Sequence, residues 1–132
     1  MKLPLIIIVD DDEQVLRGIH RDIRNQYRNS YRVSASNSAK ETLELVKELQ
    51  LKNEVVALFI SDQRMPEMEG IDFLGKAKEF FPDAKSILLT AYSDIEAAIR
   101  AINSIKLDHY LLKPWSPPRN RRSLSSERPV II

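Results

Sequence analysis

The sequence contains no cysteine among its 132 residues. A disulfide scaffold and a thiolate metal site are therefore excluded, and nothing in the chain requires an oxidising compartment. Long apolar runs are also missing. The first run, Leu5 to Val9, is too short to span a bilayer, and it ends in acidic residues rather than at a small-residue cleavage site. We therefore expect a cytoplasmic protein without a membrane segment.

A large excess of one charge is missing as well. Lys and Arg total 20 and Asp and Glu total 19, which gives no general reason to expect nucleic acid or an anionic membrane as a partner. Residues 116–132 carry four Arg and one Glu, a net charge of +3, so residues 1–115 sum to −2 within a chain of +1. Because the tail is also rich in Pro and Ser and has no helical apolar stripe, we expect a domain at 1–115 and a basic linker or disordered extension at 116–132.

Short apolar runs alternate with longer amphipathic segments along residues 1–115. The short runs predict strands at 5–9, 31–35, 55–61, 86–89 and 109–112. Apolar residues at helical spacing predict helices at 13–27, from 38 onward, at 71–81 and at 93–102. Two capping boxes, at Ser38 to Glu41 and at Ser93 to Glu96, predict where the second and fourth helices begin.

This alternation predicts a doubly wound α/β fold. Strands separated by helices of about ten residues or more require parallel, right-handed crossovers. The segment has only five strands, and no glycine-rich turn follows the first of them. We therefore expect the flavodoxin-like strand order 2-1-3-4-5 rather than a Rossmann order.

Acidic, hydroxyl and lysine side chains stand at the ends of four predicted strands. Ligands of open α/β sheets bind at the carboxyl ends of the strands, so we expect these side chains to gather at one rim. They are Asp10, Asp11 and Asp12 after the first strand, Asp62 after the third, Thr90 after the fourth and Lys113 after the fifth.

These residue types together suit phosphoryl transfer. Carboxylates that converge without a cation repel one another, and Mg²⁺ relieves this repulsion because it prefers oxygen ligands and bridges carboxylates to a phosphoryl group. Lys113 would neutralise one phosphoryl oxygen and the Thr90 hydroxyl would donate to another. A carboxylate would itself be the nucleophile, which gives an aspartyl phosphate.

Each residue also has a simpler explanation when it is taken alone. The acidic triplet is typical of a helix N-cap, and Asp62 is typical of a turn. Thr90 fits the end of a strand, and Lys113 fits a solvated surface. The four features together, at successive strand ends, are difficult to explain in that way.

Four motifs, in this order, resemble the receiver domains of bacterial two-component response regulators. They are the acidic start Val9 to Glu13, the loop Ser61 to Gly70 around Asp62, the segment Leu89 to Tyr92, and the segment Tyr110 to Pro114. Each motif alone is weak, but all four in the family's order and spacing are highly specific, and they cover about residues 3–115. The resemblance implies a phosphorylation switch that assists its own phosphorylation and dephosphorylation rather than an enzyme.

The resemblance assigns roles to matching positions around a magnesium ion. Asp62 would accept a phosphoryl group from a histidine kinase or a phosphotransfer protein. Asp11 and Asp62 would be side-chain ligands of Mg²⁺, and Asp10 would position the metal and its water. The backbone carbonyl of Arg64 would be a further ligand, whereas Asp12 would act as a helix cap.

The resemblance also implies how the switch works. Lys113 would contact the acceptor carboxylate and later the phosphoryl group. Thr90 would move toward that group and Tyr110 would turn inward behind it, which would report the change to the face of the fourth helix and fifth strand, where an output domain or a downstream protein binds. Arg64 and Tyr92 occupy the positions that tune phosphate lifetime in the family, and we expect both side chains to overhang the site.

One departure from the family keeps alternatives open. The family has a fifth helix after the Lys-Pro motif, often at the dimer contact, but no helical pattern follows Ser116. Homodimer formation therefore stays open, and so does a pseudo-receiver that binds a partner without being phosphorylated. Trp115 stands where a phenylalanine is common, and we expect it to plug the core. Binding of nucleic acid within this chain is not expected, because four arginines in a flexible tail are more often solvated.

A phosphatase of the haloacid-dehalogenase type is the enzyme alternative. The segment Ile6 to Asp12 resembles the aspartate-x-aspartate opening of that family, in which the phosphorylated residue would be Asp10. Against it, Gln14 stands where that family has Thr or Val, and no second acidic pair follows the later lysine.

Overall fold

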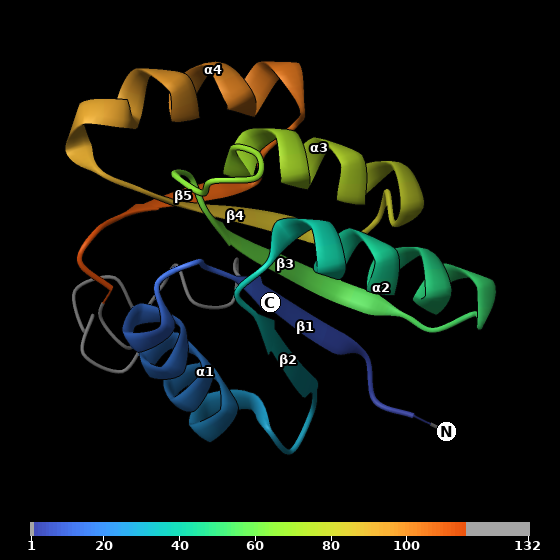
Figure 1. Ribbon diagram of the computed structural model, residues 1–132. Helices are drawn as coiled ribbons and strands as arrows, with labels where there is room; N and C mark the ends of the chain where they lie inside the picture. The colour runs from blue at the N-terminus through green and yellow to red at the C-terminus, as the bar shows by residue number, and fades with distance from the viewer. Residues whose placement is uncertain (1, 116–132) are drawn as a thin grey trace.

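The computed structural model describes residues 2–115, which form a single parallel sheet with helices on both faces (Figure 1). The strands are β1 (Leu5–Val9), β2 (Arg32–Ser36), β3 (Val56–Asp62), β4 (Lys85–Thr90) and β5 (His109–Leu112). The helices are α1 (Glu13–Tyr27), α2 (Ala39–Leu51), α3 (Gly70–Phe80) and α4 (Ile95–Ser104), with a short 3-10 turn η1 (Tyr92–Asp94) before α4. The strand order β2-β1-β3-β4-β5 confirms the flavodoxin-like prediction. The predicted linker at 116–132 lies outside the described residues.

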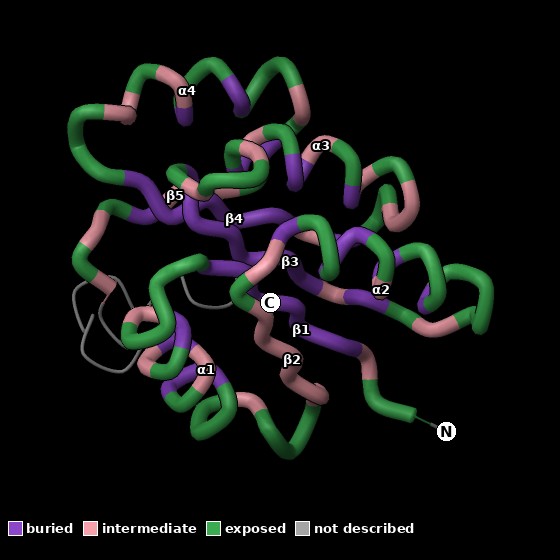
Figure 2. Tube along the Cα trace, in the orientation of Figure 1, coloured by how far each residue is buried: buried purple, intermediate pink, exposed green. Residues whose placement is uncertain are grey.

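The sheet separates two apolar cores. Helices α2, α3 and α4 cover one face, where Ile7, Phe59 and Leu88 pack against them, and α1 lies on the other face with Ile6, Ile60 and others (Figure 1). Because successive side chains of a strand point to opposite faces, a central strand between two helical layers is apolar at every position. The fully buried β1 shows this, whereas the edge strand β2 is only half-buried, which explains its weaker pattern (Figure 2).

Trp115 packs against the core beneath α1, as expected of a plug. Its indole N–H donates to Asp22 Oδ2 at 2.8 Å, and Asp22 is buried in the middle of α1. The chain just beyond β5 is thereby tied to the helix that follows β1. Among the described helices, none is long and apolar enough to cross a membrane.

Two of the three predicted helix caps are confirmed. The Asp12 carboxylate accepts hydrogen bonds from the backbone N–H groups of Gln14 and Val15 at the start of α1. The Ser38 hydroxyl accepts from Glu41 N–H at the start of α2, although Ser36 Oγ, rather than the glutamate, receives the Ser38 N–H.

The third predicted cap, at Ser93, is wrong. Residues Tyr92–Asp94 form the 3-10 turn instead, and Asp94 stands at the N-cap of α4 without a side-chain hydrogen bond to the helix. An N-cap residue has an extended backbone, whereas Ser93 lies inside a 3-10 turn that is closed by the hydrogen bond from Asp94 N–H to the Ala91 carbonyl. Both oxygens of the Asp94 carboxylate bind Arg64 instead of the helix.

Candidate functional site

The site lies at the rim where the carboxyl ends of β1, β3, β4 and β5 meet. Asp10 follows β1 directly, Asp62 and Thr90 are the last residues of β3 and β4, and Lys113 follows β5 directly. The parallel pairing of β1 with β3, β3 with β4 and β4 with β5 brings these four positions to one edge. The structure therefore places these four predicted strand-end residues at the same rim.

Asp10 is completely buried and incompletely paired. One carboxylate oxygen, Oδ1, accepts a hydrogen bond from Asp12 N–H at 2.9 Å, but Oδ2 has no protein partner within the described residues. Burial, opposed by the Asp12 hydrogen bond and reinforced by the charge of Asp62, raises the pKa of Asp10 from 3.8 to about 6. A buried carboxylate with an unsatisfied oxygen is costly unless a cation or water completes its shell.

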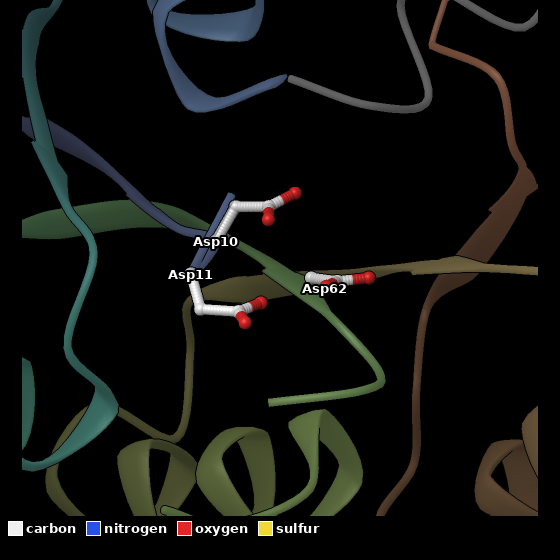
Figure 3. A group of neighbouring side chains, drawn as sticks. All are labelled: Asp10, Asp11 and Asp62. Carbon is white, nitrogen blue, oxygen red and sulfur yellow. The ribbon is translucent and has the colours of Figure 1, made fainter. Parts of the chain in front are cut away.

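Asp10, Asp11 and Asp62 form an acidic cluster at the ends of β1 and β3 (Figure 3). One carboxylate oxygen from each lies within 4.8 Å of the others, and Asp11 is exposed whereas the other two are buried. Three carboxylate oxygens with one exposed flank fit the preference of Mg²⁺ for oxygen ligands and retained waters. The orphaned Oδ2 of Asp10 supports the same fit, because it is the atom that a bound cation or its water would satisfy.

Asp62 is buried and forms an ion pair with Lys113. The distance from Lys113 Nζ to Asp62 Oδ1 is 2.5 Å. Burial raises the pKa of the Asp62 carboxyl by more than the hydrogen bond and charge of Lys113 lower it. Burial alone would lower the pKa of Lys113, but the hydrogen bond and charge of Asp62 raise it above its ordinary value. The lysine therefore stays protonated at neutral pH and holds the carboxylate in one orientation.

The two predicted switch residues lie on neighbouring strands. Thr90 is fully buried at the end of β4, and its hydroxyl donates to the Ala91 carbonyl at 3.2 Å rather than to an acidic side chain. Tyr110, on β5, is half-buried and packs against the core beneath α2, α3 and α4. The Thr90 hydroxyl is held by a single weak bond, so it is available to a new acceptor at the rim.

Arg64 and Tyr92 lie in the loops beside the rim. The Arg64 guanidinium binds Asp94 with Nε to Oδ2 at 2.9 Å and Nη2 to Oδ1 at 2.7 Å. Tyr92 is 78% exposed in η1. Both residues flank a cleft of about 650 Å³ between the two loops, which Gln63 also lines. Whether their side chains overhang a phosphoryl group stays a prediction.

Gly70 is required by the close approach of α3 to the acceptor. A Cβ at this position would overlap the carbonyl oxygen of Asp62 and lie 2.8 Å from Leu88 Cδ1. The Gly70 N–H donates to the Gln63 carbonyl at 2.9 Å. Glycine is thus needed here because the N-terminus of α3 packs directly against the backbone of β3, and not because of an unusual backbone conformation.

Sequence reasoning missed three side chains that support this loop. Gln63 is buried and its side-chain oxygen accepts from Ile71 N–H, which ties the residue after Asp62 to the start of α3. The Glu67 carboxylate accepts from the Ser38 hydroxyl and from Lys40 N–H, so it adds a second cap to α2. Asp94 holds Arg64. Their partners lie 8 to 30 residues away, so no local pattern marks them.

Comparison with known proteins agrees with this geometry. The family model described as response regulator receiver domain matches residues 6–124. The transcriptional regulatory protein ZraR of Klebsiella oxytoca is 37% identical over 120 residues, which are 91% of this chain and 25% of that protein. The hydrogenase transcriptional regulatory protein HoxA of Bradyrhizobium diazoefficiens is 30% identical over 112 residues, which are 85% of this chain and 21% of that protein. The chain thus spans a quarter or less of these two curated relatives.

Solved structures show the same fold. A protein from Neptuniibacter caesariensis has a TM-score of 0.76 and 31% identity, with 98% of this chain and 90% of that chain covered. A response regulator receiver domain protein (CheY-like) from Methanospirillum hungatei has a TM-score of 0.74 and 28% identity, with 96% and 94% covered. On the family match, the identity to these regulators and the shared fold, the chain belongs to the response regulator receiver domain family.

Proposed function

We propose that this domain accepts a phosphoryl group on Asp62 from a histidine kinase or a phosphotransfer protein. The observation that carries the proposal is the buried Asp62 carboxylate, which is held by Lys113 and lies beside the carboxylates of Asp10 and Asp11. This arrangement offers a nucleophile, a fixed positive charge and a cation-binding set of oxygens at one point. Receiver domains are phosphorylation-switch domains, and the fold of this chain is theirs.

The transfer step uses the chain's own groups as follows. An oxygen of Asp62 attacks phosphorus, the bond from phosphorus to the donor's imidazole nitrogen breaks, and that nitrogen keeps the electron pair and takes up a proton. Lys113 orients the nucleophile and then neutralises a phosphoryl oxygen, and the Thr90 hydroxyl donates to another. Asp11, Asp62 and the Arg64 carbonyl would hold Mg²⁺, with Asp10 positioning the metal and its water, and the ion would neutralise the charge of the transferring group.

The output follows from a shift between two conformations. Thr90 closes on the phosphoryl group and Tyr110 turns inward, which alters the face formed by α4 and β5. An output domain or a separate protein then reads this face. The relatives named above are transcriptional regulators four or more times longer than the matched segment, so control of a linked output domain is the function that we propose for the whole protein.

The test is the intact mass of the domain after incubation with acetyl phosphate and Mg²⁺. Wild type should gain one phosphoryl group that hydroxylamine removes, as expected of an acyl phosphate, and EDTA should prevent the gain. Asp62→Asn should gain nothing, while circular dichroism shows that it is folded.

Two other outcomes would contradict the proposal. A gain that survives Asp62→Asn and is lost in Asp10→Asn would favour the phosphatase-type chemistry at Asp10. The absence of any gain in a folded wild-type protein, with acetyl phosphate and with a phosphorylated histidine donor, would favour a pseudo-receiver that acts by binding alone.

A further inference from the structure

An ion pair joins the two loops that leave β3 and β4. Arg64 lies two residues beyond Asp62, and Asp94 lies four residues beyond Thr90. Two parallel hydrogen bonds of 2.9 and 2.7 Å connect the guanidinium to the carboxylate. Such a bidentate pair fixes direction as well as distance. The acceptor loop and the loop after the switch threonine are therefore held in one relative position.

The ion pair prevents the Asp94 carboxylate from capping α4. Asp94 stands at the N-cap of α4, where an aspartate ordinarily accepts hydrogen bonds from the free N–H groups of the first turn. Asp12 does this at the start of α1. At α4 both carboxylate oxygens bind Arg64, and no side chain caps the helix. The α4 N-terminus is thus left without a side-chain cap. Asp94 has φ −107° and ψ 12°, whereas Asp12 is extended, so a turn of Asp94 toward the helix also requires a change of ψ at this residue.

Arg64 also has an alternative partner at the start of its own loop, because a phosphoryl group would be carried by Asp62, two residues before it. The Arg64 side chain is 72% exposed beside the cleft of about 650 Å³, which gives it room to move. A phosphoryl group on Asp62 would carry nearly two negative charges, whereas Asp94 carries one. Glu69 is the other carboxylate whose charge acts on Arg64, and Glu96 and Arg100 line the same cleft. An arginine binds the more highly charged oxyanion better, so the pair is open to exchange.

We propose that Asp94 is a positioning residue that withholds Arg64 from the acceptor before phosphorylation and caps α4 after it. On phosphorylation Arg64 leaves Asp94 for the phosphoryl group on Asp62, and the freed Asp94 carboxylate turns to the first-turn N–H groups of α4. This inference rests on the proposed function, since it needs a phosphoryl group at Asp62. It supplies a direct electrostatic link from the acceptor to α4, separate from the movement of Thr90.

Two single variants separate the roles of the partners. Asp94→Asn removes the charge that holds Arg64 but keeps a good N-cap residue, and Arg64→Gln frees Asp94 but removes the cation. Both should slow hydrogen exchange at the N–H groups of Glu96 and Ala97 by about fivefold in the unphosphorylated protein, because both free a cap for α4. Only Arg64→Gln should shorten the lifetime of the aspartyl phosphate, by about threefold or more, because only it loses the stabilising cation.

Three further measurements complete the test. Phosphorylated wild type should show the same slowed exchange at Glu96 and Ala97. Arg64→Lys should restore part of the lifetime, because it keeps the charge but loses the bidentate geometry. Glu44→Gln, which breaks the exposed pair with Lys47 on α2, is the matched control and should change neither the exchange nor the lifetime.

The proposal is overturned by either of two results. Unchanged exchange at the α4 N-terminus in both variants would show that Asp94 does not turn to the helix. Equal shortening of the phosphate lifetime in both would show that the intact pair protects the phosphoryl group and no exchange of partners occurs. The exchange measurement needs no phosphoryl group, so a failure of Asp62 to react would be recognised separately.

Discussion

Helices α1 and α4 pack on the same sheet but are attached to it in different ways. Helix α1 begins with a side-chain cap at Asp12 and buries Leu16, Ile19 and Ile23 against the strands. It also receives the Trp115 indole at Asp22. Its position is therefore fixed at its start, along its inner face and from beyond β5.

Helix α4 is attached more lightly among the described residues. It has no side-chain cap, and its buried residues are only Ala98 and Ala101. Two of its three isoleucines, Ile99 and Ile102, are 49% and 42% exposed. Elements that bury little apolar surface are drawn from the low-stability end of a structure and are those that move in switches. The domain thus combines an anchored helix after Asp10 and Asp11 with a lightly attached helix after Thr90.

The largest expected effect on stability comes from comparing one buried isoleucine on α1 with one exposed isoleucine on α4. Ile19→Ala on α1 should lower the free energy of unfolding by about 2–5 kcal/mol, because it leaves a cavity in a fully buried position. Ile102→Ala on α4 should lower it by about 1 kcal/mol, because that residue is already 42% exposed and leaves no enclosed cavity. Urea unfolding of both variants measures the difference, and equal losses would show that α4 is as firmly packed as α1.

Asp10, which lies just before α1, destabilises the folded state at neutral pH. Replacing it should make the part of the fold around α1 still more stable relative to α4. Because the pKa of Asp10 is raised from 3.8 to about 6, its protonated form favours the folded state. This contribution to stability is fully present below pH 3.8 and is lost as the pH rises through 6. At pH 7.5 without divalent cations, Asp10→Asn should therefore raise the free energy of unfolding, by up to about 3 kcal/mol. Near pH 3.5 the two proteins should differ little.

Magnesium provides the control for this prediction. If the acidic cluster binds Mg²⁺, the ion should stabilise wild type more than Asp10→Asn and narrow the gap at pH 7.5. Thermal unfolding of both proteins at both pH values, with and without Mg²⁺, gives the four stability differences between them. A variant that is less stable than wild type at pH 7.5 without Mg²⁺ would mean that Asp10 is satisfied by ordered water.

The smallest effect concerns the helix caps. Asp12→Ala should cost about 1 kcal/mol, because two N–H groups of α1 lose their acceptor. Ser93→Ala should change stability by less than about 0.5 kcal/mol, because Ser93 makes no cap at α4. Chemical unfolding measured in parallel distinguishes the two, and a loss of about 1 kcal/mol in Ser93→Ala would show a cap at α4 after all.

Local patterns were sufficient to predict the sheet and its rim. Continuous apolar runs mark buried parallel strands because both faces of the sheet are covered, and an acidic, hydroxyl or lysine side chain stands at the end of β1, β3, β4 and β5. Even so, Asp62 is the last residue of β3 rather than the first of the loop, and α4 begins at Ile95 rather than after a cap at Ser93. Such shifts arise where backbone pairing continues by one residue or a distant side chain competes.

The contacts that join the loops could not be predicted from the sequence alone. Gln63, Glu67 and Asp94 each bind a group that is remote along the chain, and their residue types are common at turns and surfaces. The raised pKa of Asp10 likewise depends on burial by several elements at once. Patterns predict which groups reach the rim, whereas only the folded geometry shows which of them remain unpaired.

Trp115 gives the domain an optical reporter of its own. It is the single tryptophan of the chain, it follows Lys113 by two residues, and its indole N–H is bound to a buried carboxylate. Indole emission responds to hydrogen bonding and to nearby charge. Because the chain has one tryptophan, the tryptophan fluorescence of the unlabelled protein reports only on the surroundings of Trp115. Any change of that emission during a titration with Mg²⁺ or a phosphodonor would report on the chain just beyond Lys113, and Asp22→Asn would identify how much of the change comes from this bond.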